Sequence, residues 1–420
     1  MTAAALDNFG ALDPAGVPTP CYVIDQAKLA ENLTVLRSVA DAAGAQVLLA
    51  LKAFSCPHVA DLIGAHLHGT AASGLYEARL GRDLFPGAVH TFAPGVVPRD
   101  LPALFQASDH LIFNSLNSWA ASRPGLLEGS GNTHFGLRIN PRQQEAENPL
   151  YDPCGPASRL GATAAALAAV DGIETHFAGA AECWGLDGAA GGGLSAPRLS
   201  GLHVHALCDQ GLAPLARVLT AIEAQFADRL EQVSWLNLGG GHLITAPDYD
   251  RDGLVALLRG VAARHNVEVI LEPGTAAVLN AGALVCEVLD VGSADGHVAV
   301  VDASATCHMP DVIEGPYTPD ILGAQAIGRE APSGADAADP CVVRIGGPTC
   351  LAGDVFGTYR FDRPLAVGDR LVIRDAAYYT MVKTTTFNGT PLPAIALWEP
   401  GAEPNVVRTF GEASFRERLG

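Results

Sequence analysis

Eight short apolar runs lie between residues 46 and 272, and this regular series limits the possible folds more than any other feature of the sequence. Each run is long enough for one strand, and helical stretches such as residues 212–226 and 253–265 separate many of them. Eight strands alternating with helices are typical of a closed α/β barrel of the TIM type, although periodicity alone leaves an open doubly wound sheet as an alternative. The runs are residues 46–51, 68–73, 88–93, 109–114, 134–140, 200–206, 233–238 and 267–272.

The pattern changes after about residue 280, where short β-like runs follow one another with little helical periodicity between them. These runs are residues 283–289, 297–302, 341–345 and 370–373. We therefore expect a barrel domain of residues 20–280, followed by a mainly antiparallel β domain of residues 281–420. Residues 1–19 are expected to pack on the β domain.

Three further segments have a predicted structure of their own. Residues 21–24 form another apolar run, and Asp25 can cap a following helix that carries Leu29, Leu33 and Leu36 on one face. Residues 141–199 are too long for an ordinary barrel loop, so we predict an insertion there, with a Gly/Ala-rich part at 187–195. Residues 328–339, rich in Ala, Gly and Asp, are expected to form an exposed loop of the β domain. 

Charge and cysteine content narrow the classes of function. The formal net charge of −19 disfavours nucleic acid and anionic membranes as partners and favours a cationic small-molecule substrate. No apolar run approaches the roughly 20 residues of a membrane helix, and the start of the chain lacks the pattern of a signal peptide. The nine cysteines form no C-x2-C pair, so we expect reduced thiols, no metal site of that kind, and a cytoplasmic protein.

Reactive side chains lie at the ends of two of the predicted barrel strands. Lys52 lies in LLALKAF, where apolar neighbours would lower its pKa and favour a free amine, although an ordinary lysine at a strand end is the simpler interpretation. His203 and His205 lie in GLHVHALCDQG and share a face. They could bind a metal, fill the core as hydrogen-bonded histidines, or pack a ring on a planar ligand.

The next two strands end in a glycine triplet and a carboxylate. Gly239, Gly240 and Gly241 follow WLNL, and their N–H groups could hold a phosphate, although such triplets also occur in plain turns. Glu272 ends VILE, and a carboxylate there needs a partner, either a protonated ring nitrogen or a salt bridge at the barrel rim. Because working residues of barrels lie at the C-terminal ends of strands, these positions mark a candidate site.

The β domain adds the segment GGPTCLAGD, which presents Cys350 and Asp354 on a Gly/Pro-rich loop. Cys350 could donate a proton or could be an inert thiol, and the sequence leaves both interpretations open.

Several long segments carry a family resemblance. They are YDPCGPASRLG at 151–161, SATCHMPDVIEGPY at 304–317, GGPTCLAGDVFGTY at 346–359 and YYTMVKTTTFNG at 378–389, together with LALKAF, GLHVHALCDQ, LNLGGG, LEPG and DAAYYT. The chain resembles the fold-type III pyridoxal-phosphate-dependent decarboxylases, which include ornithine and diaminopimelate decarboxylases and share their barrel with alanine racemase. Within that group it resembles the carboxynorspermidine/carboxyspermidine decarboxylases of polyamine and spermidine biosynthesis.

The resemblance implies roles for individual residues. Lys52 would bind the aldehyde of pyridoxal 5'-phosphate, His205 would stack on its ring, and Glu272 would contact its ring nitrogen. Gly239 to Gly241, with Tyr379, would hold the phosphate. Cys350 would act as the proton donor in the active site of a neighbouring subunit, so the family implies a homodimer with its active sites at the interface.

Three residues differ from the family's sequence pattern, and these differences affect which substrate is expected. Leu351 stands where ornithine and diaminopimelate decarboxylases have an acidic residue, which argues against both of those substrates. Thr275 and Asp209 stand where the carboxynorspermidine enzymes are expected to have glutamates, which leaves a somewhat altered substrate open. The expected ligands of the substrate's cationic amines are the acidic residues Asp311, Glu314, Asp209 and Asp354.

Other functions remain to be weighed against a carboxylated-polyamine decarboxylase. They are a decarboxylase acting on another basic amino acid, a racemase on the same fold, a metal-dependent barrel hydrolase using His203 and His205, and a catalytically decayed regulatory binding protein. The presence of Lys52, His205, Glu272 and Cys350 together argues against the decayed protein.

Overall fold

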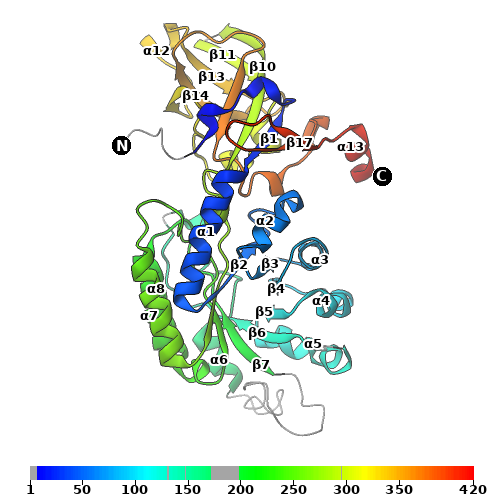
Figure 1. Ribbon diagram of the computed structural model, residues 1–420, viewed down its shortest axis with the longest axis vertical. Coiled ribbons are helices and arrows are strands. Elements are labelled where there is room, and N and C mark those ends of the chain that lie inside the picture. The colour runs from blue at the N-terminus through cyan, green and yellow to red at the C-terminus, as the bar shows by residue number, and fades with distance from the viewer. Residues whose placement is uncertain (1–6, 130–131, 147, 172–197, 295) are drawn as a thin grey trace. The chain divides into compact units, whose positions relative to one another are not determined.

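The computed structural model describes residues 7–129, 132–146, 148–171, 198–294 and 296–420 (Figure 1). The chain divides into two compact units, a β unit made of Met1–Glu31 with Val278–Gly420 and a barrel unit made of Asn32–Ala277. This division lies close to the boundary suggested by the change of sequence pattern near residue 280. The Gly/Ala-rich residues 187–195 lie outside the described residues.

The barrel unit contains a closed barrel of eight strands in chain order, and every neighbouring pair is parallel (Figure 1). All eight predicted strands are confirmed, and the open doubly wound sheet is excluded because the first strand pairs with the last. The strands are β2 (Gln46–Ala50), β3 (Gly69–Ala72), β4 (Ala88–Phe92), β5 (His110–Phe113), β6 (His134–Arg138), β7 (Leu199–His203), β8 (Trp235–Asn237) and β9 (Glu268–Leu271).

Helices lie outside this ring of strands, and Figure 1 shows α3, α4 and α5 on one side of it and α7 and α8 on the opposite side. In α8, Asp250 caps the start by accepting from the N–H of Gly253 at 2.8 Å, and Asn266 ends the helix in a left-handed conformation. The helices are α1 (Gln26–Ala43), α2 (Ala60–Gly64), α3 (Leu75–Leu84), α4 (Leu101–Ala107), α5 (Leu116–Gly129), α6 (Ala164–Asp171), α7 (Leu212–Leu230), α8 (Arg251–His265) and α9 (Thr275–Val278).

Helix α1 follows the sequence prediction closely. The carboxylate of Asp25 accepts from the N–H of Lys28 at 3.0 Å, as expected for a helix cap. Leu29, Leu33 and Leu36 are fully buried, which confirms the predicted apolar face. In the part of the chain that the structure describes, no helix is long and apolar enough to cross a membrane.

The β unit is built on one sheet with the strand order β12-β14-β13-β11-β10-β1-β16-β17, and β15 also pairs with β10. Most pairs are antiparallel, as predicted, and β1–β16 and β11–β13 are parallel. The strands are β1 (Cys21–Asp25), β10 (Gly282–Ala294), β11 (Gly296–Val301), β12 (Ala324–Gly328), β13 (Val342–Gly346), β14 (Val355–Phe361), β15 (Arg370–Arg374), β16 (Ala394–Trp398) and β17 (Asn405–Arg408).

Short helices complete both units. The α-helices of the β unit are α10 (Ala305–His308), α11 (Asp311–Glu314), α12 (Ala335–Ala338) and α13 (Glu412–Leu419). The 3-10 helices are η2 (Phe9–Ala11), η3 (Pro14–Gly16), η4 (Pro57–Val59), η5 (Pro98–Asp100), η6 (Pro149–Tyr151), η8 (Met381–Lys383) and η9 (Phe387–Gly389).

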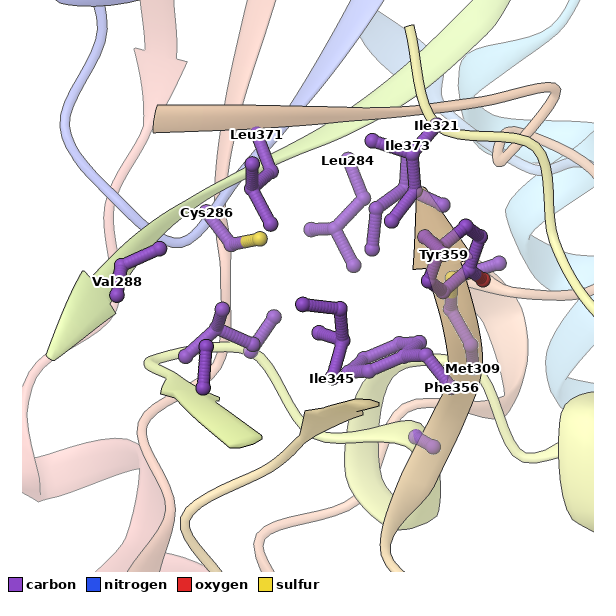
Figure 2. Close-up of a cluster of buried hydrophobic side chains, with 14 of the residues drawn as sticks. Leu284, Cys286, Val288, Met309, Ile321, Ile345, Phe356, Tyr359, Leu371 and Ile373 are labelled. Atoms are coloured by element: carbon purple, nitrogen blue, oxygen red, sulfur yellow. The ribbon is translucent and has the colours of Figure 1, made fainter. Parts of the chain in front are cut away.

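Two clusters of buried side chains stabilise the β unit. In the larger one, Leu284, Ile345, Phe356 and Ile373 point toward one another from different strands (Figure 2). In the second, the ring of Phe9 stacks on Trp398 with centroids 5.8 Å apart, so the N-terminal segment belongs to the β unit.

Strand β1 differs from the sequence prediction, which counted its residues with the barrel domain. All five of its residues are buried, and it lies in the middle of the β sheet between β10 and β16. A strand buried on both faces has the same uniform apolar composition in a sheet core as in a barrel, so composition could not separate the two positions.

Candidate active site

The barrel brings four predicted features to one rim. Lys52 follows β2, His205 follows β7, the glycine triplet follows β8 and Glu272 follows β9. Because all barrel strands are parallel, these residues meet at the C-terminal end of the barrel. A pocket there is lined by Ala50, Lys52, Ala71, Ala72, Ser73, Phe92, Arg138, His203, His205 and Glu272.

Lys52 has the surroundings of a reactive amine. Its Nζ lies 3.4 Å from Nε2 of His205. Burial lowers the pKa of Lys52, and the positive charge of Arg138 adds to that effect against the opposing charge of Glu272. A lysine with a lowered pKa offers a neutral amine at lower pH than a solvated lysine does.

His205 is held in one orientation by a main-chain N–H group. The N–H of Gly240 donates to its Nδ1 at 3.2 Å, so in the neutral ring the proton lies on Nε2, on the side of Lys52. Burial lowers the pKa of His205 well below its ordinary value, and the nearby charges of Lys52 and Arg138 act in the same direction. The imidazole is therefore neutral at physiological pH.

Glu272 is a largely buried carboxylate fixed by the side chains at the ends of β7 and β8. Its Oε1 accepts from Asn237 Nδ2 at 2.6 Å, and its Oε2 lies 3.4 Å from Nε2 of His203. Burial acts to raise the pKa of Glu272, but the interactions with His203 and Asn237 outweigh it and hold the pKa below the ordinary value. A carboxylate that stays ionised inside the barrel can stabilise a positive charge placed beside it.

The glycine triplet allows the backbone to approach two other strand ends closely. A Cβ on Gly240 would lie 2.1 Å from the carbonyl oxygen of Glu272, and one on Gly241 would lie 2.0 Å from that of Leu207. Gly239 and Gly241 also have positive φ values of 66° and 86°. No other residue type fits these positions. We call the space beside Gly239, Gly240 and Gly241 the glycine cradle, and a side chain on the triplet would fill it.

Two N–H groups of the triplet already have acceptors. Gly239 donates to Oδ1 of Asn237 at 2.8 Å, and Gly240 donates to His205. Gly241 is therefore the member of the triplet that could supply an N–H group to a bound anion.

Two residues that line the pocket, Arg138 and Phe92, and one that contacts Glu272, Asn237, were not predicted from the sequence. Arg138 donates to the carbonyl oxygen of His205 at 3.1 Å and lies over the ring of Phe92, 4.5 Å from its centroid. Phe92 in turn stacks on His203, with centroids 5.3 Å apart. Phe92, Arg138 and Asn237 are the last residues of β4, β6 and β8, so their positions at strand ends were the signal that could have identified them.

Asp209 and Thr275, the two departures noted in the sequence, interact with each other. They lie in the segments after β7 and β9, and Thr275 donates a side-chain hydrogen bond to Asp209. Desolvation raises the pKa of Asp209, and the hydrogen bond from Thr275 acts against it. Asp209 also has a left-handed backbone, with φ of 52°.

In the β unit, Cys350 and Tyr379 lie on loops. Cys350 is exposed, and its N–H donates to Oδ1 of Asn388 at 2.9 Å. Tyr379 has a positive φ of 56°, and its carbonyl oxygen accepts from the N–H of Lys383.

Asp354, proposed from the sequence as a ligand of the substrate, is buried and already satisfied by hydrogen bonds. Its oxygens accept from the hydroxyls of Ser304 and Thr349 and from the N–H groups of Thr306 and Thr349, at 2.7–3.2 Å. These contacts favour a role in holding the GGPTC loop over a role in binding a ligand.

Asp311 and Glu314, the remaining predicted ligands, both bind the ammonium of Lys383. His203, considered as a metal ligand, instead contacts Glu272. Within residues 7–129, 132–146, 148–171, 198–294 and 296–420, no group of three or more His, Cys, Asp or Glu side chains could hold a metal ion.

The barrel site has the groups that pyridoxal phosphate requires. Lys52 is an amine with a lowered pKa, Glu272 is an ionised carboxylate inside the barrel, and Gly241 belongs to a cradle that a Cβ would fill. Together they match the cofactor's aldehyde, ring nitrogen and phosphate. The fold and the site thus define an enzyme of the pyridoxal-phosphate class.

Comparison with known proteins agrees with this class. Residues 21–377 match the family described as "Pyridoxal-dependent decarboxylase, C-terminal sheet domain". The carboxyaminopropylagmatine decarboxylase of Synechocystis sp. is 38% identical, with 97% of this chain and 96% of that protein covered. The carboxynorspermidine/carboxyspermidine decarboxylase of Campylobacter jejuni is 35% identical, with 96% and 98% covered.

Solved structures give the same result. The crystal structure of carboxynorspermidine decarboxylase from C. jejuni in complex with norspermidine superposes with a TM-score of 0.81 at 33% identity, covering 96% of this chain and 100% of that one. A diaminopimelate decarboxylase at 22% identity, with a TM-score of 0.73 and 97% and 94% of the two chains covered, shares the fold. The chain belongs to the pyridoxal-dependent decarboxylase family, and it is a carboxy-lyase with pyridoxal phosphate as its cofactor.

Proposed function

We propose that the chain decarboxylates carboxynorspermidine and carboxyspermidine to norspermidine and spermidine in polyamine biosynthesis. The observation that carries the proposal is similarity over nearly the whole chain to enzymes named for carboxylated polyamines, at 35–38% identity. Leu351 supports it, because an exposed leucine there offers no charge to the distal group of ornithine or diaminopimelate.

The chain's own residues prepare the site. The Lys52 amine, whose pKa burial lowers, would hold the aldehyde of the cofactor. The ring of His205 would lie against the cofactor ring, and the ionised Glu272 would keep the ring nitrogen protonated. When bound, pyridoxal phosphate supplies the electron sink that accepts the charge left when CO2 departs.

Protonation of the product completes the reaction. We propose that Cys350 of the partner subunit delivers the proton from its Sγ to the α-carbon, as a general acid. This role requires a homodimer with shared active sites, and the exposed loop position of Cys350 is consistent with it. The described cysteines are all free thiols, which supports a location in the reducing cytoplasm.

A second substrate is favoured by two observations. The relative from Synechocystis sp. is named for carboxyaminopropylagmatine, which ends in a guanidinium. Asp209 is one methylene shorter than glutamate, and it accepts a hydrogen bond from Thr275. Its carboxylate charge therefore lies further back than the charge of a glutamate at the same position would. A shorter carboxylate leaves more room beside it. A broad planar guanidinium needs that room more than a compact ammonium does.

The test is release of CO2 by the holoenzyme from each of the three carboxylated polyamines, with ornithine and diaminopimelate as controls. We expect release from at least one carboxylated polyamine and none from the two controls. Release from ornithine would instead identify a decarboxylase of another basic amino acid. A protein that neither binds pyridoxal phosphate nor releases CO2 would be the decayed regulatory protein.

A further inference from the structure

Asn237 connects two parts of the barrel site, the carboxylate of Glu272 and the first residue of the glycine triplet. Its Oδ1 accepts from the N–H of Gly239 at 2.8 Å, and its Nδ2 donates to Oε1 of Glu272 at 2.6 Å. The N–H of Glu272 in turn donates to the carbonyl oxygen of Gly239 at 2.7 Å. The three residues therefore form a closed ring of three short hydrogen bonds.

The orientation of the Asn237 amide follows from its neighbours. A main-chain N–H can only donate, so the amide atom that faces Gly239 is the oxygen, and the NH2 group faces Glu272. Asn237 is 0% exposed, so solvent does not compete for either group. The bond to Glu272 has an ionised acceptor, and such bonds are shorter and stronger than bonds between neutral groups.

The two parts that Asn237 connects would hold different groups of the cofactor. In the proposed roles, Glu272 contacts the ring nitrogen and the glycine triplet contacts the phosphate. Both groups belong to one rigid aromatic ring with a short side arm, so the distance between them varies little. A protein that binds both groups at once needs its own two binding elements at a matching distance.

We infer that Asn237 is a positioning residue that fixes Glu272 relative to the glycine triplet, so that the ring nitrogen and the phosphate of the cofactor are bound together. This inference rests on the proposed function in taking Glu272 as the partner of the ring nitrogen. It is independent of which substrate is decarboxylated. Asn237 acts through Glu272 and Gly239, and its own contact with the cofactor is not required.

The competing explanation is that Asn237 only fills space inside the barrel. Pyridoxal distinguishes the two explanations, because it has the ring and the aldehyde of the cofactor but no phosphate. Asn237→Leu keeps the side-chain volume and removes both hydrogen bonds. If Asn237 positions both parts, this variant loses about tenfold in affinity for pyridoxal and about 50-fold for pyridoxal phosphate, as expected for one and two lost hydrogen bonds. If Asn237 only fills space, the two affinities change by the same factor.

Asn237→Asp separates the two hydrogen bonds. The new side chain keeps an oxygen for the N–H of Gly239, but it places a second carboxyl group against Glu272. The carboxylate that serves the ring nitrogen is then affected while the glycine triplet stays in place. The affinities for pyridoxal and pyridoxal phosphate should therefore change by the same factor in this variant.

The experiment measures the dissociation constants of the full-length apoenzymes for pyridoxal and for pyridoxal phosphate by fluorescence titration. Asn140→Asp is the matched control, because Asn140 is also a buried asparagine of the barrel unit and its NH2 group donates only to main-chain carbonyl oxygens after β6. We expect the ratio of the pyridoxal constant to the pyridoxal phosphate constant to fall about fivefold in Asn237→Leu. The ratio should keep its wild-type value in Asn237→Asp and Asn140→Asp.

An unchanged ratio in Asn237→Leu would overturn the inference. If that variant does not fold, Asn237→Ala removes the same two hydrogen bonds, and an unchanged ratio there would overturn it in the same way.

Glu272→Gln distinguishes failure of this inference from failure of the proposed function. Wild-type affinity of Glu272→Gln for pyridoxal would reject the proposed role of Glu272 at the ring nitrogen. Weaker binding to Glu272→Gln, together with an unchanged ratio in Asn237→Leu, would reject the role of Asn237 alone. Absence of CO2 release from every carboxylated polyamine would reject the proposed reaction and would leave the measured affinities as they are.

Discussion

The barrel and the β unit each bury a carboxylate, and the two carboxylates have different surroundings. Glu272 accepts from Asn237 and lies beside His203 in a pocket that also contains the amine of Lys52. Asp354 accepts hydrogen bonds from Ser304, Thr306 and Thr349, and both of its oxygens are used more than once.

This difference distinguishes a carboxylate that can serve a bound ligand from a carboxylate with a structural role. A buried carboxylate whose hydrogen bonds are all made within the protein stabilises a loop and has little capacity left for a ligand. A buried carboxylate beside a pocket that contains a reactive amine can serve a bound molecule. The barrel rim is therefore the region where chemistry is expected, and the loop around Asp354 holds Cys350 in place.

The largest expected effect comes from removing the amine. Lys52→Ala should lower the rate of CO2 release by about 10³-fold or more, because the enzyme loses the group that binds and exchanges the cofactor. Lys28→Ala, which removes a partly exposed lysine on α1, should leave the rate unchanged. Full activity in Lys52→Ala would mean that the barrel rim is not the active site.

The two carboxylates should respond in different ways to becoming amides. Glu272→Gln should reduce kcat by about 10²-fold, since an amide does not stabilise a proton on the ring nitrogen. Asp354→Asn should instead lower stability by about 1–3 kcal/mol, because an NH2 group would face buried donors. Denaturant unfolding and initial rates distinguish these outcomes. A raised KM in folded Asp354→Asn would restore Asp354 as a ligand of the substrate.

The glycine cradle gives a smaller and more specific effect. Gly240→Ala places a Cβ against the carbonyl oxygen of Glu272 and should weaken binding of pyridoxal phosphate by about 10-fold or more, as expected for displaced positioning groups. Gly95→Ala is the matched control, because a Cβ there meets nothing within 4 Å. Equal cofactor affinity in both variants, measured by fluorescence titration, would show that the glycine triplet does not contribute to binding of pyridoxal phosphate.

The smallest effect concerns the stability of the apoenzyme. The pKa of Lys52 is lowered in the folded protein, so between its folded pKa and 10.5 the unfolded chain binds more protons and stability rises with pH. At pH values below the folded pKa, the full free-energy cost of burying Lys52 remains. At pH values above 10.5, that cost vanishes. Lys52→Met should therefore stabilise the apoenzyme by on the order of 1–3 kcal/mol at neutral pH.

Thermal unfolding of the two apoenzymes from pH 7 to pH 11 checks this prediction. The difference in Tm should be greatest at neutral pH and should shrink as the pH rises. A difference that stays constant over this range would show that packing, and not the proton equilibrium of Lys52, separates the two proteins.

The barrel was predictable because each of its strands is a short apolar run, and the reactive residues follow those runs directly. Lys52, His205 and Glu272 could be found in this way, since the position of a residue after a strand determines its end of the barrel. The same local pattern misplaced β1, because a run of five buried residues carries no information about its neighbours.

The contacts that tune the site were not predictable from local pattern. Asn237 and His203 meet Glu272 across 35 and 69 residues of chain, and only closure of the barrel brings these strand ends together. Lys383 lies 72 residues from Asp311, and no spacing rule links them. Strand β12 was missed because most of its residues are exposed and its composition resembles a loop.

The most direct test of the central claim is the visible absorption spectrum of the purified protein with pyridoxal phosphate, before and after carboxynorspermidine is added. We predict a visible band for the wild type that shifts on addition of substrate, and no such band for Lys52→Ala. A wild-type protein that stays colourless with added cofactor, or a Lys52→Ala variant with the same band, would contradict the account.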